Sequence, residues 1–221
     1  MLRTETPAFL AELAANNNKP WFDANRPAYD AAKTDFLSLL TDVIARLGTV
    51  DPEIATANLL PKGCIFRINR DVRFSKDKAP YKSNFAAWFN AGGKNSAAAG
   101  YYLHIAPGES FVAGGMYMPE PAVLNRIRQE IDYNLPGFEA MLAEPKFAAY
   151  FSGLSRENAL SRPPKGYETD NPAIEYLKLK SFTASHQLPV KLLTQKKLVD
   201  EIIGAFAGMQ PLVAFLNRGL E

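Results

Sequence analysis

Two β-like segments joined by a tight turn lie at the centre of the chain, where residues 100–118 read GYYLHIAPGESFVAGGMYM. Aromatic and β-branched residues, which favour strands, are frequent in Gly100–Ile105 and Ser110–Met118. Between the two segments lies Ala106-Pro107-Gly108-Glu109, whose proline and glycine are typical of a turn. We therefore predict an antiparallel hairpin at this point.

Two further β-like segments precede the hairpin. These are Cys64–Phe74 and Ser83–Asn90, which the turn-like segment Lys76–Pro80 separates. Together with the hairpin they predict an antiparallel meander of about four strands. The segments Ser155–Ser161 and Lys180–Gln187 are predicted as additional strands.

Helical periodicity flanks the strands on both sides, with apolar residues recurring in steps of three and four. The predicted helices are Pro7–Asn16, a short piece opening at Pro20, a long helix from near Pro27 to Gly48, Pro121–Tyr133, Pro136–Phe151 with a bend at Pro145, and a region from Thr194 in which Pro211 starts a separate final turn. This order favours the α+β class: a central antiparallel sheet, with helices from both ends of the chain packed on one face. The other face of the sheet is left open for a site.

The composition is that of a globular protein. Of the 221 residues, 47% are apolar and 22% are charged, which excludes disordered, collagen-like and coiled-coil classes. No repeat or Gly/Ser linker is evident, so we predict a single domain over residues 1–221. The sequence has no uninterrupted apolar run of roughly 18 residues and no apolar signal region at its start, and it has one cysteine, Cys64. These features predict a cytoplasmic protein without membrane association.

The positive charge is concentrated in one segment of the chain. The formal net charge is only +2, yet seven of the 25 lysines and arginines lie between residues 62 and 82, together with two acidic residues. The acidic residues are Asp71 and Asp77, and the basic residues are Lys62, Arg67, Arg70, Arg73, Lys76, Lys78 and Lys82. Such a segment raises the local concentration of anions and predicts an anionic partner.

If residues 64–74 form a strand, its period of two places Arg67, Asp71 and Arg73 on one face. Each guanidinium offers a planar fork of donors that fits a carboxylate or a phosphate. A single aspartate cannot satisfy both forks, so donor capacity is left for a ligand or for a neighbouring strand. Arg70 falls among the apolar residues of the opposite face, where it must be paired or turned outward by a bulge.

Three hypotheses for the function follow from this segment, and the sequence leaves them open. The first is a site for a small anionic ligand, for example a phosphorylated one, on the open sheet face, with or without catalysis. Its ligand-binding residues would be Arg67, Arg70, Asp71, Arg73, Lys76, Lys78, Tyr81 and Lys82. The alternative is a structural or partner-docking domain, in which the Arg/Asp network is purely architectural. The third is nucleic-acid binding through the Lys76–Lys82 loop, with Tyr81 stacking on a base.

The candidates for catalysis are few. Asp71 is a weak candidate base, and His104, which shares a strand face with Tyr102, is another. A lone histidine in a strand is more often a hydrogen-bonded structural residue, and His186 is the weaker of the two histidines. With two histidines and one cysteine far apart we predict no His/Cys metal site, and the absence of nucleotide-binding motifs predicts no cofactor. The sequence does not predict an oligomeric state.

The long basic motif resembles the signature of a family of uncharacterised bacterial proteins, a conserved domain of unknown function. The signature is F-R-I-x-R-D-V-R-F-S-K-D-K-x-P-Y-K, which matches residues 66–82. The resemblance extends to Asn17–Phe22, Tyr101–Ile105, Gly114–Pro119 and Pro164–Tyr167, and so covers nearly the whole chain. It implies a single-domain organisation and draws attention to the Arg/Asp/Lys segment, but it implies no particular mechanism.

Overall fold

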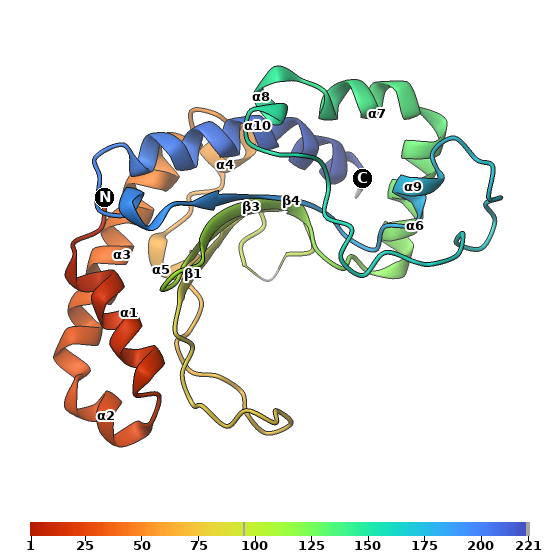
Figure 1. The fold of residues 1–221 in the computed structure, drawn as a ribbon. Coiled ribbons are helices and arrows are strands. Elements are labelled where there is room, and N and C mark those ends of the chain that lie inside the picture. The colour runs from red at the N-terminus through yellow and green to blue at the C-terminus, as the bar shows by residue number, and fades with distance from the viewer. Residues whose placement is uncertain (95, 220–221) are drawn as a thin grey trace.

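The structure is a computed structural model that describes residues 1–94 and 96–219. It is an α+β fold in which one four-stranded antiparallel sheet has the order β1-β2-β3-β4. The strands are β1 Phe85–Phe89, β2 Gly100–Ile105, β3 Ser110–Met116 and β4 Phe182–Leu188. Figure 1 shows α10 lying above this sheet, α1 and α2 extending below it at the N-terminal side, and a long irregular loop hanging below it.

Helices precede and follow the first three strands, as predicted. Before β1 lie α1 Glu5–Ala15, α2 Lys19–Ala24, α3 Arg26–Leu47, α4 Pro52–Thr56 and α5 Pro61–Cys64. After β3 lie α6 Pro121–Tyr133, α7 Leu135–Leu142, α8 Pro145–Ala148, α9 Ile174–Leu177, the 3₁₀ turn η1 Val190–Leu192 and α10 Leu198–Arg218. Helices from both ends of the chain pack on one face of the sheet, which confirms the predicted arrangement.

Aromatic rings join the sheet to the helices that cover it. The Phe85 ring of β1 stacks on Phe36 of α3 with 5.3 Å between ring centroids. In β2, the Tyr101 ring lies 5.1 Å from Phe206 of α10. These side chains are all buried, because the odd-numbered positions of β1 and β2 face the helices. The even-numbered positions therefore point to the opposite face, which we call the open face.

The predicted strand at Cys64–Phe74 is wrong. Its first residue ends α5, and the remainder makes only isolated bridges, at Ile65 with Ala87 and at Asn69 with Tyr81. Pro61 at the first position of a helical turn explains the local helix. The fourth strand of the meander is instead β4, which lies within two residues of the predicted segment Lys180–Gln187.

Three smaller predictions also need correction. Ser155–Ser161 is not a strand; its Ser155 and Leu160 amides each donate one backbone hydrogen bond, to Thr183 and Lys178, without forming a ladder. The helix predicted over Pro136–Phe151 is divided into α7 and α8 just before Pro145. Pro211 does not start a separate turn, because α10 continues through it.

Helix α10 forms a large part of the hydrophobic core. By length and composition alone it could cross a membrane, but 61% of its most apolar 18-residue window is buried inside the fold. Buried residues of α10 lie against β3, α3 and α8. Core helices commonly combine this length and hydropathy.

Candidate functional site

Residues 65–84 form an irregular hairpin below the sheet, which we call the basic arm (Figure 1). Its two sides pair antiparallel at a few points. The Phe66 amide donates to the carbonyl of Ala86 at 2.9 Å, the Lys82 amide to Ile68 at 2.8 Å, and the Arg70 amide to Pro80 at 2.9 Å. The basic arm thus continues the antiparallel pairing at the β1 edge in an irregular form.

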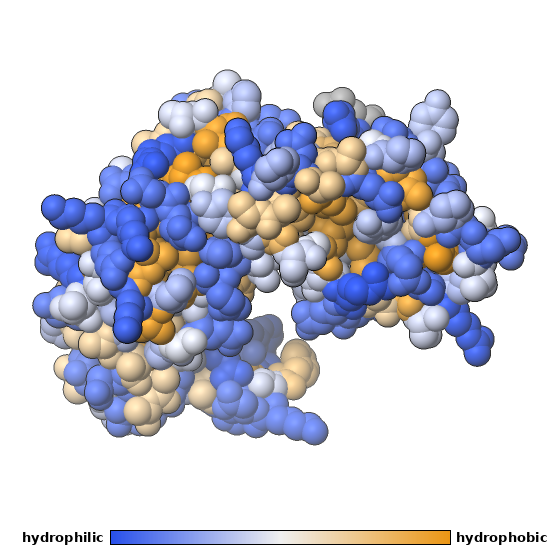
Figure 2. Space-filling model, turned by 45° about the horizontal axis from the view of Figure 1, so that its top comes forward, coloured by the Kyte–Doolittle hydropathy of each residue, from blue (hydrophilic) through white to orange (hydrophobic). Residues whose placement is uncertain are grey.

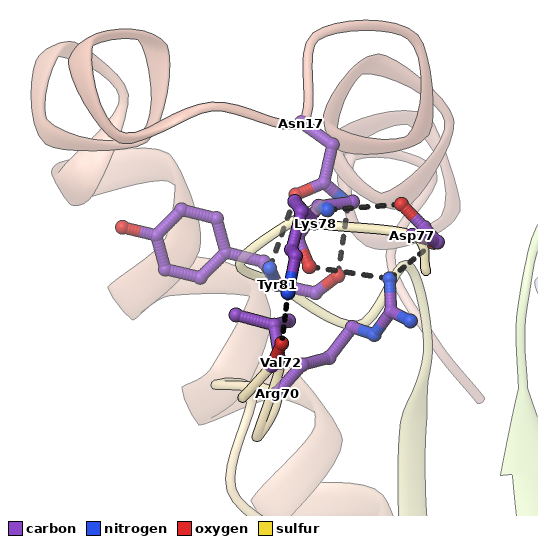
Figure 3. Close-up of polar contacts among 7 residues, drawn as sticks. Asn17, Arg70, Val72, Asp77, Lys78 and Tyr81 are labelled. Atoms are coloured by element: carbon purple, nitrogen blue, oxygen red, sulfur yellow. Dashed lines mark hydrogen bonds and ion pairs between the residues drawn. The ribbon is translucent and has the colours of Figure 1, made fainter. Parts of the chain in front are cut away.

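The basic arm is anchored to the N-terminal helices through Tyr81 (Figure 3). The side-chain amide of Asn17, between α1 and α2, donates to the Tyr81 carbonyl at 2.9 Å and accepts from the Tyr81 amide at 3.1 Å. The Tyr81 ring stacks on Phe22 of α2 with 4.0 Å between centroids. Tyr81 is buried, so its ring packs against α2 instead of projecting into solvent.

Charged groups near the tip of the basic arm satisfy one another. The Arg70 guanidinium binds the Asp77 carboxylate and also donates to the Ala79 carbonyl at 3.2 Å. The hydrogen bond from the Ala79 amide, and to a smaller extent the one from Arg70, lowers the pKa of Asp77 below its usual value. Lys78 donates from Nζ to the carbonyl of Val72 at 3.0 Å (Figure 3). These contacts close the turn of the arm.

Arg73 and Asp71 form a second internal pair. Nε and Nη2 of Arg73 donate to the two carboxylate oxygens of Asp71 at 3.0 and 2.7 Å. These hydrogen bonds, with one from the Arg73 amide, lower the pKa of Asp71. Because residues 67–73 are not a strand, the predicted row of Arg67, Asp71 and Arg73 on one sheet face does not form. Lys76 is exposed on the arm.

Three cations converge at the root of the basic arm. The ammonium nitrogens of Lys82 and Lys94 lie 5.5 and 5.7 Å from the centroid of the same ring, Phe66. Burial lowers the pKa of Lys82, and the charges of Arg67 and Lys94 lower it further. Among residues 1–94 and 96–219, none of these three cations forms a salt bridge with an acidic group.

A cavity of about 380 Å³ opens beside Lys82. It lies between the basic arm and the end of α1, and it is lined by Ala14, Asn17, Arg70, Asp77, Ala79, Tyr81, Lys82, Ser83 and Asn84. Among the described residues that line it, Asp77 is the acidic one, and it is paired with Arg70. Figure 2 shows the surface deeply hollowed on the side of the sheet away from the helices.

Beyond Asn84, a row of partly exposed rings covers the open face. Tyr102 and His104 stand on β2, and Phe111 stands on β3 directly opposite His104. The His104 and Phe111 rings stack with 4.8 Å between centroids. Tyr102 reaches Phe66 of the arm in an edge-on contact of 6.2 Å. The rings therefore lead from the cationic root of the arm across the sheet.

The predicted face shared by Tyr102 and His104 is observed. The Tyr102 hydroxyl lies 3.1 Å from Nδ1 of His104, and the amide nitrogen of Asn84 lies 3.5 Å from the same atom. Burial lowers the pKa of His104, against a smaller opposite effect of Glu109. His186 lies elsewhere, between the Tyr150 carbonyl and Glu201 of α10.

The structure divides the predicted site residues into two groups. Arg70, Tyr81 and Lys82 line the cavity, and the charge of Arg67 acts on Lys82. Arg70 is also paired with Asp77, and Asp71, Arg73 and Lys78 are held in contacts within the arm. Sequence reasoning missed a further set at the root and on the open face, which is Phe66, Asn84, Lys94 and Phe111. Alternation along Ser83–Asn90 and Ser110–Met118 could have placed Asn84 and Phe111 on the face of His104, but no pattern pointed to Lys94.

No group of three or more His, Cys, Asp or Glu side chains within the described part of the chain could hold a metal ion. Cys64 is buried, and burial raises the pKa of its thiol to about 11. The thiol therefore packs as a small apolar group.

The comparison with protein families matches nearly the full length of the chain. No curated protein and no solved structure matches it. The sequence model of one family, described as conserved hypothetical protein (DUF2461), matches residues 5–215. Because this match covers far more than half of the chain, the protein belongs to the DUF2461 family.

Proposed function

We propose that the cavity at the root of the basic arm binds a small oxyanion, such as a phosphorylated or carboxylated metabolite. The observation that carries this proposal is that Lys82, which lines the cavity, shares the Phe66 ring with Lys94 and lies close enough to Arg67 for its charge to act on Lys82. None of the three cations has an acidic partner among the described residues. Like charges held together beside a partly buried lysine cost free energy, and a bound anion would remove that cost.

Polar groups other than the cations also support an anionic ligand. Ser83 and Asn84 line the cavity together with Lys82, so the lining offers a hydroxyl-bearing and an amide-bearing residue besides the lysine. A site that combines a charge with neutral donors is suited to several oxygens of one anion. The volume of about 380 Å³ suits a small molecule.

An architectural role is favoured for the tip of the basic arm. The pairs Arg70–Asp77 and Arg73–Asp71, and the contact from Lys78 to the Val72 carbonyl, satisfy these side chains within the arm itself. We therefore assign these contacts a structural role, in which Arg70 and Asp77 also form part of the cavity wall, and we assign the binding role to Lys82. Stacking of a base on Tyr81 would require its ring to leave Phe22, so nucleic acid remains the weakest of the three hypotheses.

The test is a thermal-shift and calorimetric titration with inorganic phosphate, sulfate and phenyl phosphate. A ligand at 100 times its dissociation constant adds about 2.7 kcal/mol to the free energy of unfolding. We expect Lys82→Met to weaken binding of the best ligand at least tenfold. The matched control is Lys191→Met, which removes an exposed lysine of η1. This turn follows β4, the edge strand farthest from β1 and the arm.

If both lysine variants lost binding equally, the loss would follow from the change in net charge alone. That result would contradict a specific site at Lys82. No binding of any probe by the wild-type protein, together with a folded Lys82→Met variant, would also contradict it. Loss confined to Lys82→Met is the expected result.

A further inference from the structure

Lys82 is the most buried of the three cations at the root of the basic arm. Its side chain is half-buried, whereas Arg67 and Lys94 are exposed. Lys94 is held in place because its Nζ donates to the Ile65 carbonyl at 3.0 Å, so its charge stays beside the Phe66 ring that it shares with Lys82. No hydrogen bond or ion pair of the Lys82 ammonium is found in the described part of the chain, so nothing described there holds its proton.

This arrangement favours the neutral amine of Lys82. Burial lowers the pKa of Lys82, and the charges of Arg67 and Lys94 lower it further. The two other charged groups in the cavity wall, Arg70 and Asp77, pair with one another. A lysine that is partly desolvated and lies next to other cations is activated as a nucleophile toward carbonyl groups. Lys82 also lines the cavity, so a small molecule bound there contacts this residue.

From these contacts we propose that Lys82 is the nucleophile of an imine-forming site, whose ligands carry both an oxyanion and an aldehyde or ketone group. This role rests on the proposed function, because the lysine that attracts the oxyanion is the one that reacts. In its protonated form Lys82 adds to the positive charge of the site. In its neutral form it attacks the carbonyl carbon, while Arg67 and Lys94 still provide charge for the oxyanion. Simple oxo acids are the smallest ligands that carry both groups.

The reaction is balanced without an oxidant or a reductant. The lone pair of the neutral Nζ forms a C–N bond with the carbonyl carbon, and the π electrons of the C=O bond move to the oxygen. A proton passes from the nitrogen to this oxygen, which gives a carbinolamine. The carbinolamine then loses its hydroxyl group, together with the second proton of the nitrogen, as water, and a C=N bond forms. One amine and one carbonyl thus give one imine and one water.

The first measurement traps the imine in the wild-type protein. Pyruvate is the probe, cyanoborohydride reduces the imine to a stable secondary amine, and mass spectrometry of peptides locates the carboxyethyl group. At neutral pH we expect Lys82 to be labelled about tenfold faster than the exposed Lys191 of η1, because its neighbours favour the free amine and concentrate the anion. Pyruvamide, which has the same ketone without the negative charge, should show a smaller preference for Lys82.

The second measurement tests the neighbouring cations. Arg67→Met and Lys94→Met change exposed side chains, and each should slow the labelling of Lys82 by pyruvate. Each should also move the pH profile of this labelling upward, toward the ordinary lysine pKa of 10.5. The control Lys191→Met should change neither the rate nor the profile at Lys82. An unchanged profile in both cation variants would overturn the inference.

The outcomes separate this inference from the proposed function. If phosphate binds in a manner that depends on Lys82, but pyruvate labels Lys82 no faster than Lys191, the cavity binds anions and the inference fails alone. If Lys82 is labelled selectively and inorganic phosphate slows this labelling, both proposals are supported. If pyruvate and pyruvamide show the same preference and phosphate has no effect, the amine is reactive but the site binds no oxyanion, and both proposals fail.

Discussion

The side-chain amide of Asn17 forms two hydrogen bonds with the backbone of Tyr81, a residue 64 positions later in the chain. The amide acts as donor to the Tyr81 carbonyl and as acceptor from its N–H, as a backbone partner in a sheet would (Figure 3). Lys82 follows immediately. The backbone at Lys82, the proposed anion-binding lysine, is therefore held by a contact with the N-terminal helices as well as by its own hydrogen bond to Ile68 in the arm.

The first prediction concerns this anchor. Asn17→Ala leaves the two backbone groups of Tyr81 without partners in a partly buried place, which costs about 1–3 kcal/mol. We expect a lower free energy of unfolding and faster hydrogen exchange at the Tyr81 amide. The control is Asn16→Ala, whose amide contacts only the Glu12 carbonyl at the end of α1. Unchanged exchange at Tyr81 in Asn17→Ala would contradict the anchoring role.

The second prediction is that Lys82 lowers the stability of the unliganded protein. Its folded-state pKa is below the ordinary 10.5, first because of burial and then because of Arg67 and Lys94. We expect Lys82→Met to raise the free energy of unfolding by a few tenths to about 1 kcal/mol, the range of partly exposed charge interactions.

The pH dependence of that effect has a defined sign. A cation with a lowered folded-state pKa binds more protons when unfolded, so its cost is present below the folded-state pKa and is relieved as pH rises toward 10.5. Urea unfolding at pH 7 and at pH 10 should show the stability gain of Lys82→Met shrinking at the higher pH. A gain that grows with pH would contradict the assignment.

The central hairpin and the class of fold could be predicted from the sequence because their signals are local. Alternating aromatic residues and a Pro-Gly turn define β2 and β3, and apolar periodicity defines α3 and α6. The segment after Cys64 has the same strand-like alternation, yet it forms an arm. Its charged residues pair with one another across the turn. Whether the segment forms a strand or an arm depends on these contacts, which the alternation of residues along the sequence does not reveal.

The site was only partly predictable for a similar reason. The concentration of charge drew attention to the arm, and Lys82, which lines the cavity, was among the candidates. Which cations have no acidic partner among the described residues depends on pairings such as Arg70 with Asp77, and on Lys94 approaching Phe66 from the loop between β1 and β2. These pairings and contacts depend on which residues lie close together in the folded protein, and the spacing of residues in the sequence does not show this.

The third prediction concerns close strand packing at Gly115, which lies opposite Gly100 in the β2–β3 register. Its φ is +109°, and a Cβ atom there would lie 2.0 Å from the Phe182 carbonyl oxygen of β4. Gly115→Ala must therefore displace backbone, and we expect a loss of at least about 2–3 kcal/mol or failure to fold. Gly63→Ala, where the added carbon meets nothing within 4 Å, should leave the unfolding midpoint nearly unchanged.

The fourth prediction concerns the hydroxyl of Tyr101, which donates a 2.6 Å hydrogen bond to the buried carboxylate of Asp51. That carboxylate also caps α4 by accepting from the Glu53 amide. Tyr101→Phe leaves one of its oxygens without this donor, and we expect a loss of about 1–3 kcal/mol in chemical denaturation. The matched control is Tyr133→Phe, at a side chain that is 90% exposed, and equal stability of the two variants would contradict a stabilising role for the bond.

The last prediction concerns stability in alkaline solution. Burial raises the pKa of the Cys64 thiol from an ordinary 9.0 to about 11. Between these values the thiol ionises in the unfolded chain but not in the folded protein, so the contribution of Cys64 is present below pH 9 and is lost as pH rises. Partly buried tyrosines with raised pKa values, including Tyr102, add to the fall above pH 10. Urea unfolding at pH 8, 9 and 10 should therefore give a smaller decrease for Cys64→Ala than for wild type, although the variant starts from a lower stability because it leaves a small cavity. Parallel decreases in the two proteins would mean that the thiol ionises as readily folded as unfolded, which would contradict its burial at the end of α5.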